Sequence, residues 1–176
     1  MTPSLRHGPP LLVAALLLAA CSAGGERAPL TASPDLAVGP LPPIVAAPAR
    51  QITLIRSLTC SCCAGHEAHL MRAGFDVSSQ LTEAYTSVKD AHLIPADMRS
   101  CHTSLVGRYF VEGHVPVAAI EQLLRDGPDI DGIALPGMPP GSPGMGGVAD
   151  GPLTIYAISD GSVVGEFGRF EAPLER

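Results

Sequence analysis

Residues 51–80, QITLIRSLTCSCCAGHEAHLMRAGFDVSSQ, contain the pattern that decides the fold. Residues 51–56 alternate in polarity and are rich in β-branched side chains, which is typical of a strand. A cysteine cluster follows at once, and residues 62–73 then suit a helix that stops at Gly74. Residues 75–80 indicate a second strand. The order strand, cysteine turn, helix, strand predicts an α/β fold.

The rest of the domain continues in the same way. We expect a short helix over 83–91, a strand over 103–111 with Gly107 as a bulge, and a helix over 116–127. A loop rich in Gly, Pro and Met over 136–151 precedes a hairpin formed by 153–158 and 162–167. This order fits a thioredoxin-like α/β sandwich with a central mixed sheet over residues 51–176.

The N-terminal residues 1–20 predict a lipoprotein signal peptide. Arg6 precedes an apolar run over 11–20, which is too short to span a bilayer but suits the core of a signal peptide. The run ends in Leu-Ala-Ala-Cys, which resembles a bacterial lipobox and makes Cys21 the expected lipidation site. The alternative is an ordinary cleavable signal peptide with an unrelated cysteine.

Residues 21–50 are predicted to be a lipid-anchored tether. Ala, Pro, Gly and Leu dominate, and because no periodic apolar face is present, the segment cannot bury enough surface to fold. Ser22 after the lipidated cysteine favours sorting to the outer membrane. We therefore expect a periplasmic protein that contacts the membrane only through its lipid anchor.

The net charge and the cysteines limit the classes of function that the protein can have. The net charge of −6 and the absence of a basic patch in the sequence argue against nucleic acid as a partner. Besides Cys21, the chain has Cys60, Cys62, Cys63 and Cys101. An exported protein would be expected to form disulfides, and Cys60 with Cys63 is one such pairing. Adjacent Cys62 and Cys63 are poorly placed to bond each other, which is unlike a structural disulfide framework.

The cysteine turn also suits a soft metal. Cys60 and Cys63 have C-x-x-C spacing where a helix begins, and amides there lower a thiol pKa. A redox dithiol has no need of Cys62, whereas a metal cluster with bridging thiolates uses this additional sulfur. Thiolate sulfur selects Cu(I) or zinc. Met138 and Met145 in a loop poor in other side chains favour copper, because thioether sulfur binds Cu(I) and Ag(I) better than zinc.

Four blocks occur in one order: C-x-C-C at 60–63, S-C-H-T at 100–103, E-G-H-V-P at 112–116 and P-G-M-P-x-G-S-P-G-M at 136–145. Over about residues 52–170 the sequence resembles a family of small bacterial periplasmic proteins, long described as a domain of unknown function, that includes the CopG copper-resistance proteins. The resemblance implies a thioredoxin-like fold and copper bound through cysteines. The core ligands it implies are Cys60, Cys62, Cys63 and Cys101, and the further ones are His102, His114, Met138 and Met145.

The chain departs from that family at two positions. Members usually have a tryptophan where this chain has His66, and an acidic residue where it has Gly146. His66 shares a helix face with Cys62 and could add an imidazole to the site, but we expect it to be an exposed polar substitution. His69 and His92 are expected on the surface.

The histidines of the motifs leave alternatives open. Neighbouring side chains on a strand point to opposite faces, so Cys101 and His102 can reach one ion only if a turn lies there. His114 is either a ligand or a buried histidine that hydrogen-bonds a loop, and the two methionines are either ligands or hydrophobic contacts under the loop.

Two functions follow. The first is sequestration of copper or silver ions, or their transfer to an efflux or resistance protein, without turnover; bridging thiolates could hold more than one Cu(I). The second is a thiol-disulfide oxidoreductase with Cys60 as nucleophile and Cys63 as resolving thiol. A protein that changes the oxidation state of copper combines the two. The sequence does not clearly indicate an enzyme.

Overall fold

The computed structural model describes residues 50–173. The predicted signal peptide, the lipidation site Cys21 and the tether up to residue 49 lie outside the described residues and stay predictions. None of the helices within 50–173 has the length and hydropathy that a membrane crossing requires.

The described chain alternates strands and short helices. The strands are β1 (Gln51–Arg56), β2 (Asp76–Leu81), β3 (His102–Val106), β4 (Tyr109–Glu112), β5 (Gly132–Ala134), β6 (Leu153–Ser159) and β7 (Ser162–Phe170). The helices are α1 (Ser61–Arg72), α2 (Tyr85–Ala91) and α3 (Val117–Asp126), with a short 3₁₀ turn at Ala96–Met98. The predicted α/β fold is confirmed.

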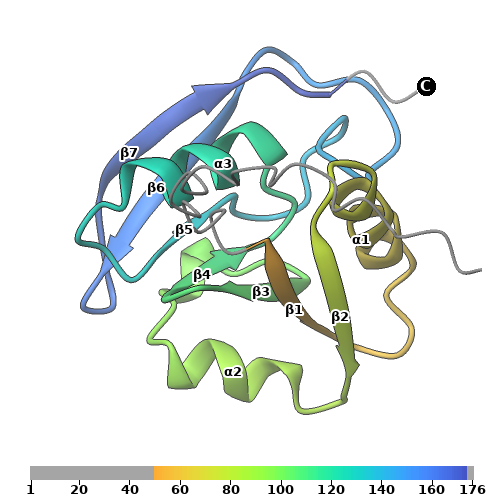
Figure 1. Cartoon of the computed structure of the whole chain (residues 1–176), viewed down its shortest axis with the longest axis horizontal. Helices are drawn as coiled ribbons and strands as arrows, with labels where there is room; N and C mark the ends of the chain where they lie inside the picture. Colours follow the sequence, from red (N-terminus) through yellow and green to blue (C-terminus); the bar gives the residue numbers. More distant parts are fainter. Residues whose placement is uncertain (1–49, 174–176) are drawn as a thin grey trace, which may run out of the picture. The chain divides into compact units, whose positions relative to one another are not determined.

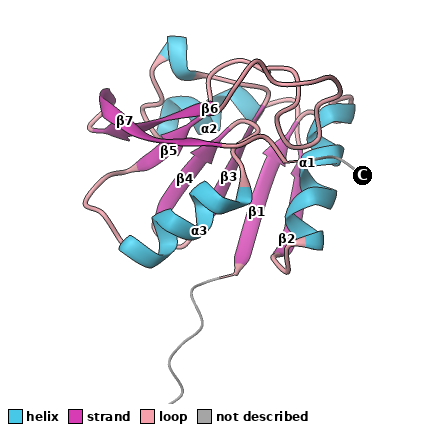
Figure 2. Ribbon diagram, turned by 90° about the horizontal axis from the view of Figure 1, so that it is seen from above, coloured by secondary structure: helices cyan, strands magenta, loops and turns pink. Residues whose placement is uncertain are grey.

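All strands join one mixed sheet in the order β2-β1-β3-β4-β5-β6-β7. β1 is parallel to β2, as a strand–helix–strand unit requires, and antiparallel to β3. β4 pairs with β5 in parallel, and β6 and β7 form the predicted hairpin. Helices α1 and α3 cover one face of the sheet and α2 covers the other, which makes the three-layer sandwich (Figures 1 and 2).

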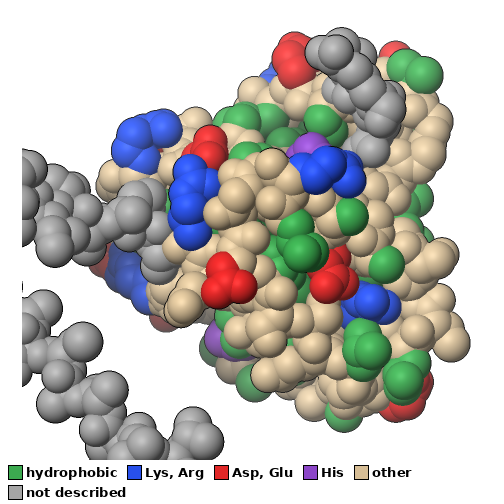
Figure 3. All heavy atoms as spheres, turned by 45° about the vertical axis from the view of Figure 1, so that its right-hand side comes forward, with side chains coloured by type: hydrophobic (Ala, Val, Ile, Leu, Met, Phe, Trp, Pro, Cys, Tyr) green, Lys and Arg blue, Asp and Glu red, His purple; other side chains and the backbone are tan. Residues whose placement is uncertain are grey.

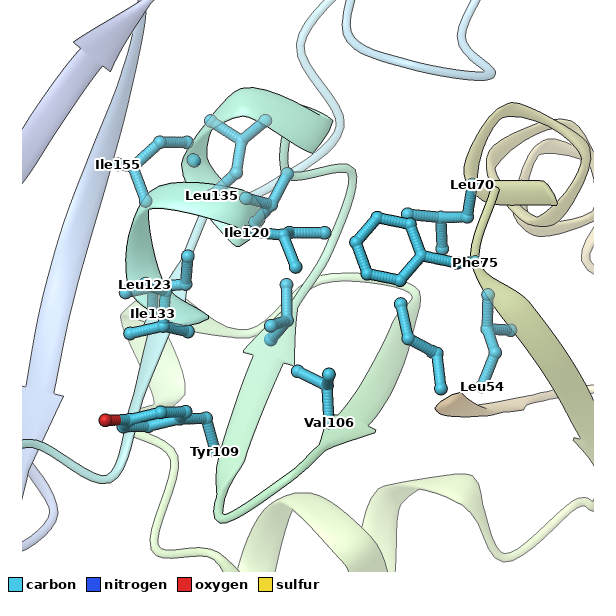
Figure 4. Packing of buried hydrophobic residues seen from close by; sticks show 14 of the residues in the cluster. Leu54, Leu70, Phe75, Val106, Tyr109, Ile120, Leu123, Ile133, Leu135 and Ile155 are labelled. Atoms are coloured by element: carbon cyan, nitrogen blue, oxygen red, sulfur yellow. The ribbon is translucent and has the colours of Figure 1, made fainter. Parts of the chain in front are cut away.

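Each face of the sheet has its own apolar cluster. The larger one joins Leu70 of α1 and Ile120 and Leu123 of α3 to inward side chains of the central strands (Figure 4). The smaller one, on the α2 side, contains Ile94 and Phe110. Because successive strand residues point to opposite faces, β4 contributes to both clusters.

Helix boundaries agree closely with the local signals. α3 follows Pro116 and is closed by Gly127, which has a positive φ of 57°. Glycine suits the left-handed backbone conformation at this position, because it has no Cβ to clash. The helix ends are therefore encoded by neighbours along the chain.

The predicted single strand over 103–111 is wrong, because two antiparallel strands occupy it. β3 ends at Val106, the chain reverses at Gly107 with φ 56°, and β4 begins at Tyr109. The residues on both sides favour strands, so the periodicity alone did not reveal the reversal. Strand β5, only three residues long, was also not predicted; its Gly132 lies against Phe110, where a Cβ would meet the carbonyl oxygen at 2.3 Å.

Candidate metal centre

The four sequence motifs meet at the end of β1. Helix α1 starts after the short turn over 57–60 that follows this strand, with Cys60 as its N-cap residue. Antiparallel pairing places Arg56, the last residue of β1, opposite His102, the first residue of β3. The cysteine turn and the Cys101 segment therefore lie side by side, although nearly forty residues separate them in sequence.

One donor group consists of four cysteines. The sulfur atoms of Cys60, Cys62, Cys63 and Cys101 all lie within 4.8 Å of one another. Cys60 and Cys63 form a disulfide, the pairing that the sequence left as an alternative, while Cys62 and Cys101 are free thiols. Cys62 Sγ lies 3.5 Å from Cys60 Sγ. Reduction of the disulfide would be needed to give four thiolates.

A second donor group shares Cys101 with the first. The ligand atoms of Cys101, His102 and His114 also lie within 4.8 Å of one another. Cys101 Sγ is 3.3 Å from His102 Nδ1 and 3.0 Å from His114 Nε2. Cys101 stands at a bend just before β3, and this is the turn that allows neighbouring residues 101 and 102 to face one point.

The expectation that His66 is exposed is wrong. The side chain is fully buried on α1. Its Nδ1 lies 2.7 Å from His102 Nε2 and its Nε2 lies 3.1 Å from the carbonyl oxygen of Val115. Its ring centroid is 4.8 Å from that of His102 and 5.3 Å from that of His114. The sequence indicates that His66 shares a helix face with Cys62, but it does not indicate that the His66 side chain is buried.

Burial keeps these imidazoles neutral and the shared thiol protonated. It lowers the pKa of His66 to about 3 and lowers the pKa values of His102 and His114. Burial also raises the pKa of the Cys101 thiol to about 12, with a further contribution from nearby Cys62. Neutral imidazole is the ligand form of histidine, whereas Cys101 must lose a proton before its sulfur can bind a metal as thiolate.

A buried ion pair supports the segment around Cys101. Lys89 of α2 contacts Glu112 of β4 at 2.5 Å, and both side chains are almost fully buried. Glu112 also accepts hydrogen bonds from Thr103 Oγ1 and from the backbone N–H of Ser100, each at 2.6 Å. These bonds hold the backbone of Ser100 and the side chain of Thr103, one on each side of Cys101, which was not foreseen from the sequence.

The Gly/Pro/Met loop closes over the site. Pro143 O lies 2.7 Å from His114 Nδ1. Gly144 packs so closely on α1 that a Cβ there would lie 2.2 Å from His66 N. Met138 is half exposed on this loop and Met145 is partly buried beside Gly144. Both methionines stay predicted ligands.

Arg56 lies at the base of the cysteine turn. Its Nη1 donates to the carbonyl oxygen of Cys60 at 3.3 Å, and its Nη2 is 3.6 Å from a carboxylate oxygen of Glu67. A guanidinium here would offset part of the negative charge of several thiolates. On the face shown in Figure 3, the basic and acidic side chains of the described residues are interspersed.

Comparison with known proteins found one family model and two solved structures that match this chain. A family model described as a protein of unknown function, DUF411, matches residues 98–145, which hold three of the four motifs. Two solved structures, named copper resistance protein CopG form 1 and form 2, each share 35% sequence identity with this chain. Form 1 aligns with a TM-score of 0.62 over 69% of this chain and 97% of its own, and form 2 with 0.63 over 68% and 97%. No curated protein matches.

Proposed function

The chain belongs to the CopG-like copper-resistance family, and from this premise we propose that it binds Cu(I) through the thiolates of Cys60, Cys62, Cys63 and Cys101. His102 and His114 complete the donor set, and Met138 and Met145 are further ligands. The protein sequesters the ion or passes it on. Its role is in resistance to copper, with silver as a second cargo of similar ligand preference.

The convergence of two donor groups on one sulfur carries this proposal. Cys101 belongs both to the four-cysteine group and to the group with His102 and His114. Soft thiolates select Cu(I), and imidazole accepts both common oxidation states of copper. Bridging by Cys101 would allow more than one ion to be held between the groups.

Export and anchoring are part of the proposal. A signal peptide over 1–20, lipidation at Cys21 and a tether to about residue 50 would place the folded domain in the periplasm at the outer membrane. An efflux or resistance protein of the same compartment is the proposed acceptor of the ion.

The Cys60–Cys63 disulfide favours a second candidate function, thiol-disulfide exchange. Cys60 caps α1 and is partly exposed, whereas Cys63 is fully buried. An exposed sulfur followed by a buried one at the start of a helix suits a nucleophile and its resolving thiol. In the reduced protein, the Cys60 thiolate would attack an external disulfide, form a mixed disulfide and release one external thiolate. Cys63 would then attack Cys60, release the second external thiolate and restore the Cys60–Cys63 disulfide, so that the external disulfide is reduced to a dithiol.

Metal analysis with thiol counting distinguishes these functions. The protein is reduced, purified without oxygen and loaded with Cu(I). We expect one or more copper ions per chain and protection of all four thiols from alkylation. A protein that retains no copper, and whose Cys60–Cys63 disulfide is reduced readily by a protein dithiol, would support the oxidoreductase function instead.

Replacement of Cys62 by Ser tests the cluster. Cys62→Ser should bind markedly less copper per chain, because a bridging sulfur is lost, while Cys60 and Cys63 can still form their disulfide. The matched control is Ser61→Ala, at the neighbouring exposed position, which should load like the parent. Equal copper content in Cys62→Ser and the parent would refute the thiolate cluster.

A further inference from the structure

His66 has a defined partner at each ring nitrogen. The ring is fully buried between α1 and the start of β3. Nε2 faces the carbonyl oxygen of Val115 at 3.1 Å, and Nδ1 faces His102 Nε2 at 2.7 Å. Both rings are fully buried beside each other, and burial disfavours the charged form of an imidazole, so each ring carries a single proton.

These partners determine which nitrogen carries each proton. A carbonyl oxygen only accepts hydrogen bonds, so His66 must donate from Nε2 to Val115, which leaves Nδ1 of His66 as an acceptor. His102 must then donate from its own Nε2 to His66. The remaining nitrogen of His102, Nδ1, therefore carries a lone pair, and it lies 3.3 Å from Cys101 Sγ.

His114 reaches the same sulfur by a different route. Its Nδ1 donates to the carbonyl oxygen of Pro143 at 2.7 Å, so its Nε2 carries the lone pair. That lone pair lies 3.0 Å from Cys101 Sγ. Two imidazole lone pairs thus face the Cys101 sulfur. A hydrogen bond to a loop carbonyl orients the ring of His114, and a hydrogen bond to His66 orients the ring of His102.

We infer that His66 is a positioning residue that fixes the tautomer and ring orientation of His102, so that His102 binds copper through Nδ1 beside Cys101. The inference rests on the proposed function for the metal, but its tautomer part concerns the metal-free protein alone. A hydrogen bond to the distal nitrogen of a ligating histidine orients the ring and raises its basicity, and loss of such a partner costs about 10- to 100-fold in metal affinity.

The first readout is the tautomer of His102 in the reduced, metal-free protein. Two-bond ¹H–¹⁵N correlation spectra of histidine-labelled protein identify which nitrogen carries the proton. We expect His102 to be protonated at Nε2 in the parent. His66→Phe removes the acceptor, so His102 should shift toward the Nδ1–H form, with that proton directed at the Cys101 sulfur.

His66→Asn provides the rescue. The asparagine side-chain oxygen lies about where Nδ1 of the imidazole lies and accepts a hydrogen bond, so the parent tautomer should return. His92→Phe, the same substitution at a histidine of the α2 end, serves as the control. Cu(I) affinity measured by chelator competition should fall about 10- to 100-fold in His66→Phe and stay near the parent value in His66→Asn and His92→Phe.

Each outcome decides the inference. A parent protein with His102 protonated at Nδ1, or a His66→Phe protein with an unchanged His102 tautomer, would overturn it. An altered tautomer without loss of copper affinity would overturn the positioning role. If His66→Phe does not fold, the parent tautomer and the affinity of His66→Asn still decide. A parent that binds no Cu(I) would refute the proposed function, while the tautomer readout would still judge the arrangement of His66 and His102.

Discussion

Cys101 is the residue on which the two donor groups depend. Its sulfur is common to the four-cysteine group and to the group with His102 and His114. Burial raises the pKa of its thiol to about 12, and the Cys62 thiol adds to the shift. Since the raised pKa keeps the thiol protonated throughout the neutral range, a metal ion must displace this proton to bind.

Copper affinity should therefore rise with pH. Between about pH 6 and pH 8, the apparent affinity for Cu(I) should increase by at least about tenfold per pH unit, because the Cys101 proton alone contributes one unit of slope. The lowered histidine pKa values keep imidazole protonation from adding a large term in this range. Chelator competition at several pH values measures the slope.

Cys101→Ser provides the comparison for this slope. The variant should show a smaller pH dependence, by about one proton, as well as a lower affinity. An affinity of the parent protein that does not change with pH would contradict a thiolate site at Cys101.

At the scale of elements, the site depends on how the 136–151 loop packs on α1. Gly144, with φ 80°, touches the backbone of Gly65 and His66 so closely that no side chain fits. The preceding Pro143 accepts the hydrogen bond from His114. Close packing of this loop therefore sets the orientation of a candidate ligand on another element.

Gly144→Ala should destabilise the loop and weaken metal binding together. The added Cβ would lie 2.2 Å from His66 N. We expect a loss of about 3 kcal/mol in the free energy of unfolding, from overpacking and from a positive φ at a non-glycine residue. Urea unfolding and Cu(I) competition measure the two effects.

Gly146→Ala is the matched control in the same loop. A Cβ at Gly146 would meet nothing within 4 Å, and φ there is not positive. Its stability should change by less than about 0.5 kcal/mol. Equal stabilities for the two variants would show that the loop does not depend on the contact between Gly144 and α1.

At the scale of the whole molecule, the fold buries three neutral histidines in one place. His66, His102 and His114 all have pKa values below the ordinary value of 6.5, mainly because of burial. The unfolded chain binds protons at these positions below about pH 6.5, whereas the folded protein binds them only at lower pH. The contribution of these histidines to stability is therefore fully present above this pH and is lost as the pH decreases.

The metal-free protein should lose stability on mild acidification. Each buried histidine contributes up to about 1.4 kcal/mol per pH unit below about pH 6.5. Burial raises the pKa of Glu112, whose ordinary value is 4.5. Above that pH, the contribution of Glu112 to stability decreases as the pH rises, which opposes the effect of the histidines. Urea unfolding of the parent and of His66→Asn at about pH 7.5 and pH 5.5 measures the contribution of this one histidine. The variant should lose less stability than the parent between the two pH values. Identical losses in the two proteins would contradict a buried, neutral His66.

Much of the fold could be predicted from local sequence. The alternation over 51–56, the cysteines before a helix, and the Pro116 and Gly127 boundaries depend on neighbours along the chain, and the structure confirms the elements they predict. The spacing of residues 60–63 likewise brings three cysteines to one helix start whatever the rest of the chain does. The reversal at Gly107 was missed because strand-forming residues flank it on both sides.

What only the tertiary structure decided is which side chains face one another. A histidine on α1 is buried rather than exposed because the β4–α3 connection supplies the carbonyl of Val115 and β3 supplies His102. The bend at Cys101 is held by Glu112, which belongs to the next strand. Periodicity and capping act over a few residues, whereas the burial of a polar ring and the direction of its lone pair depend on partners that only the folded chain brings together.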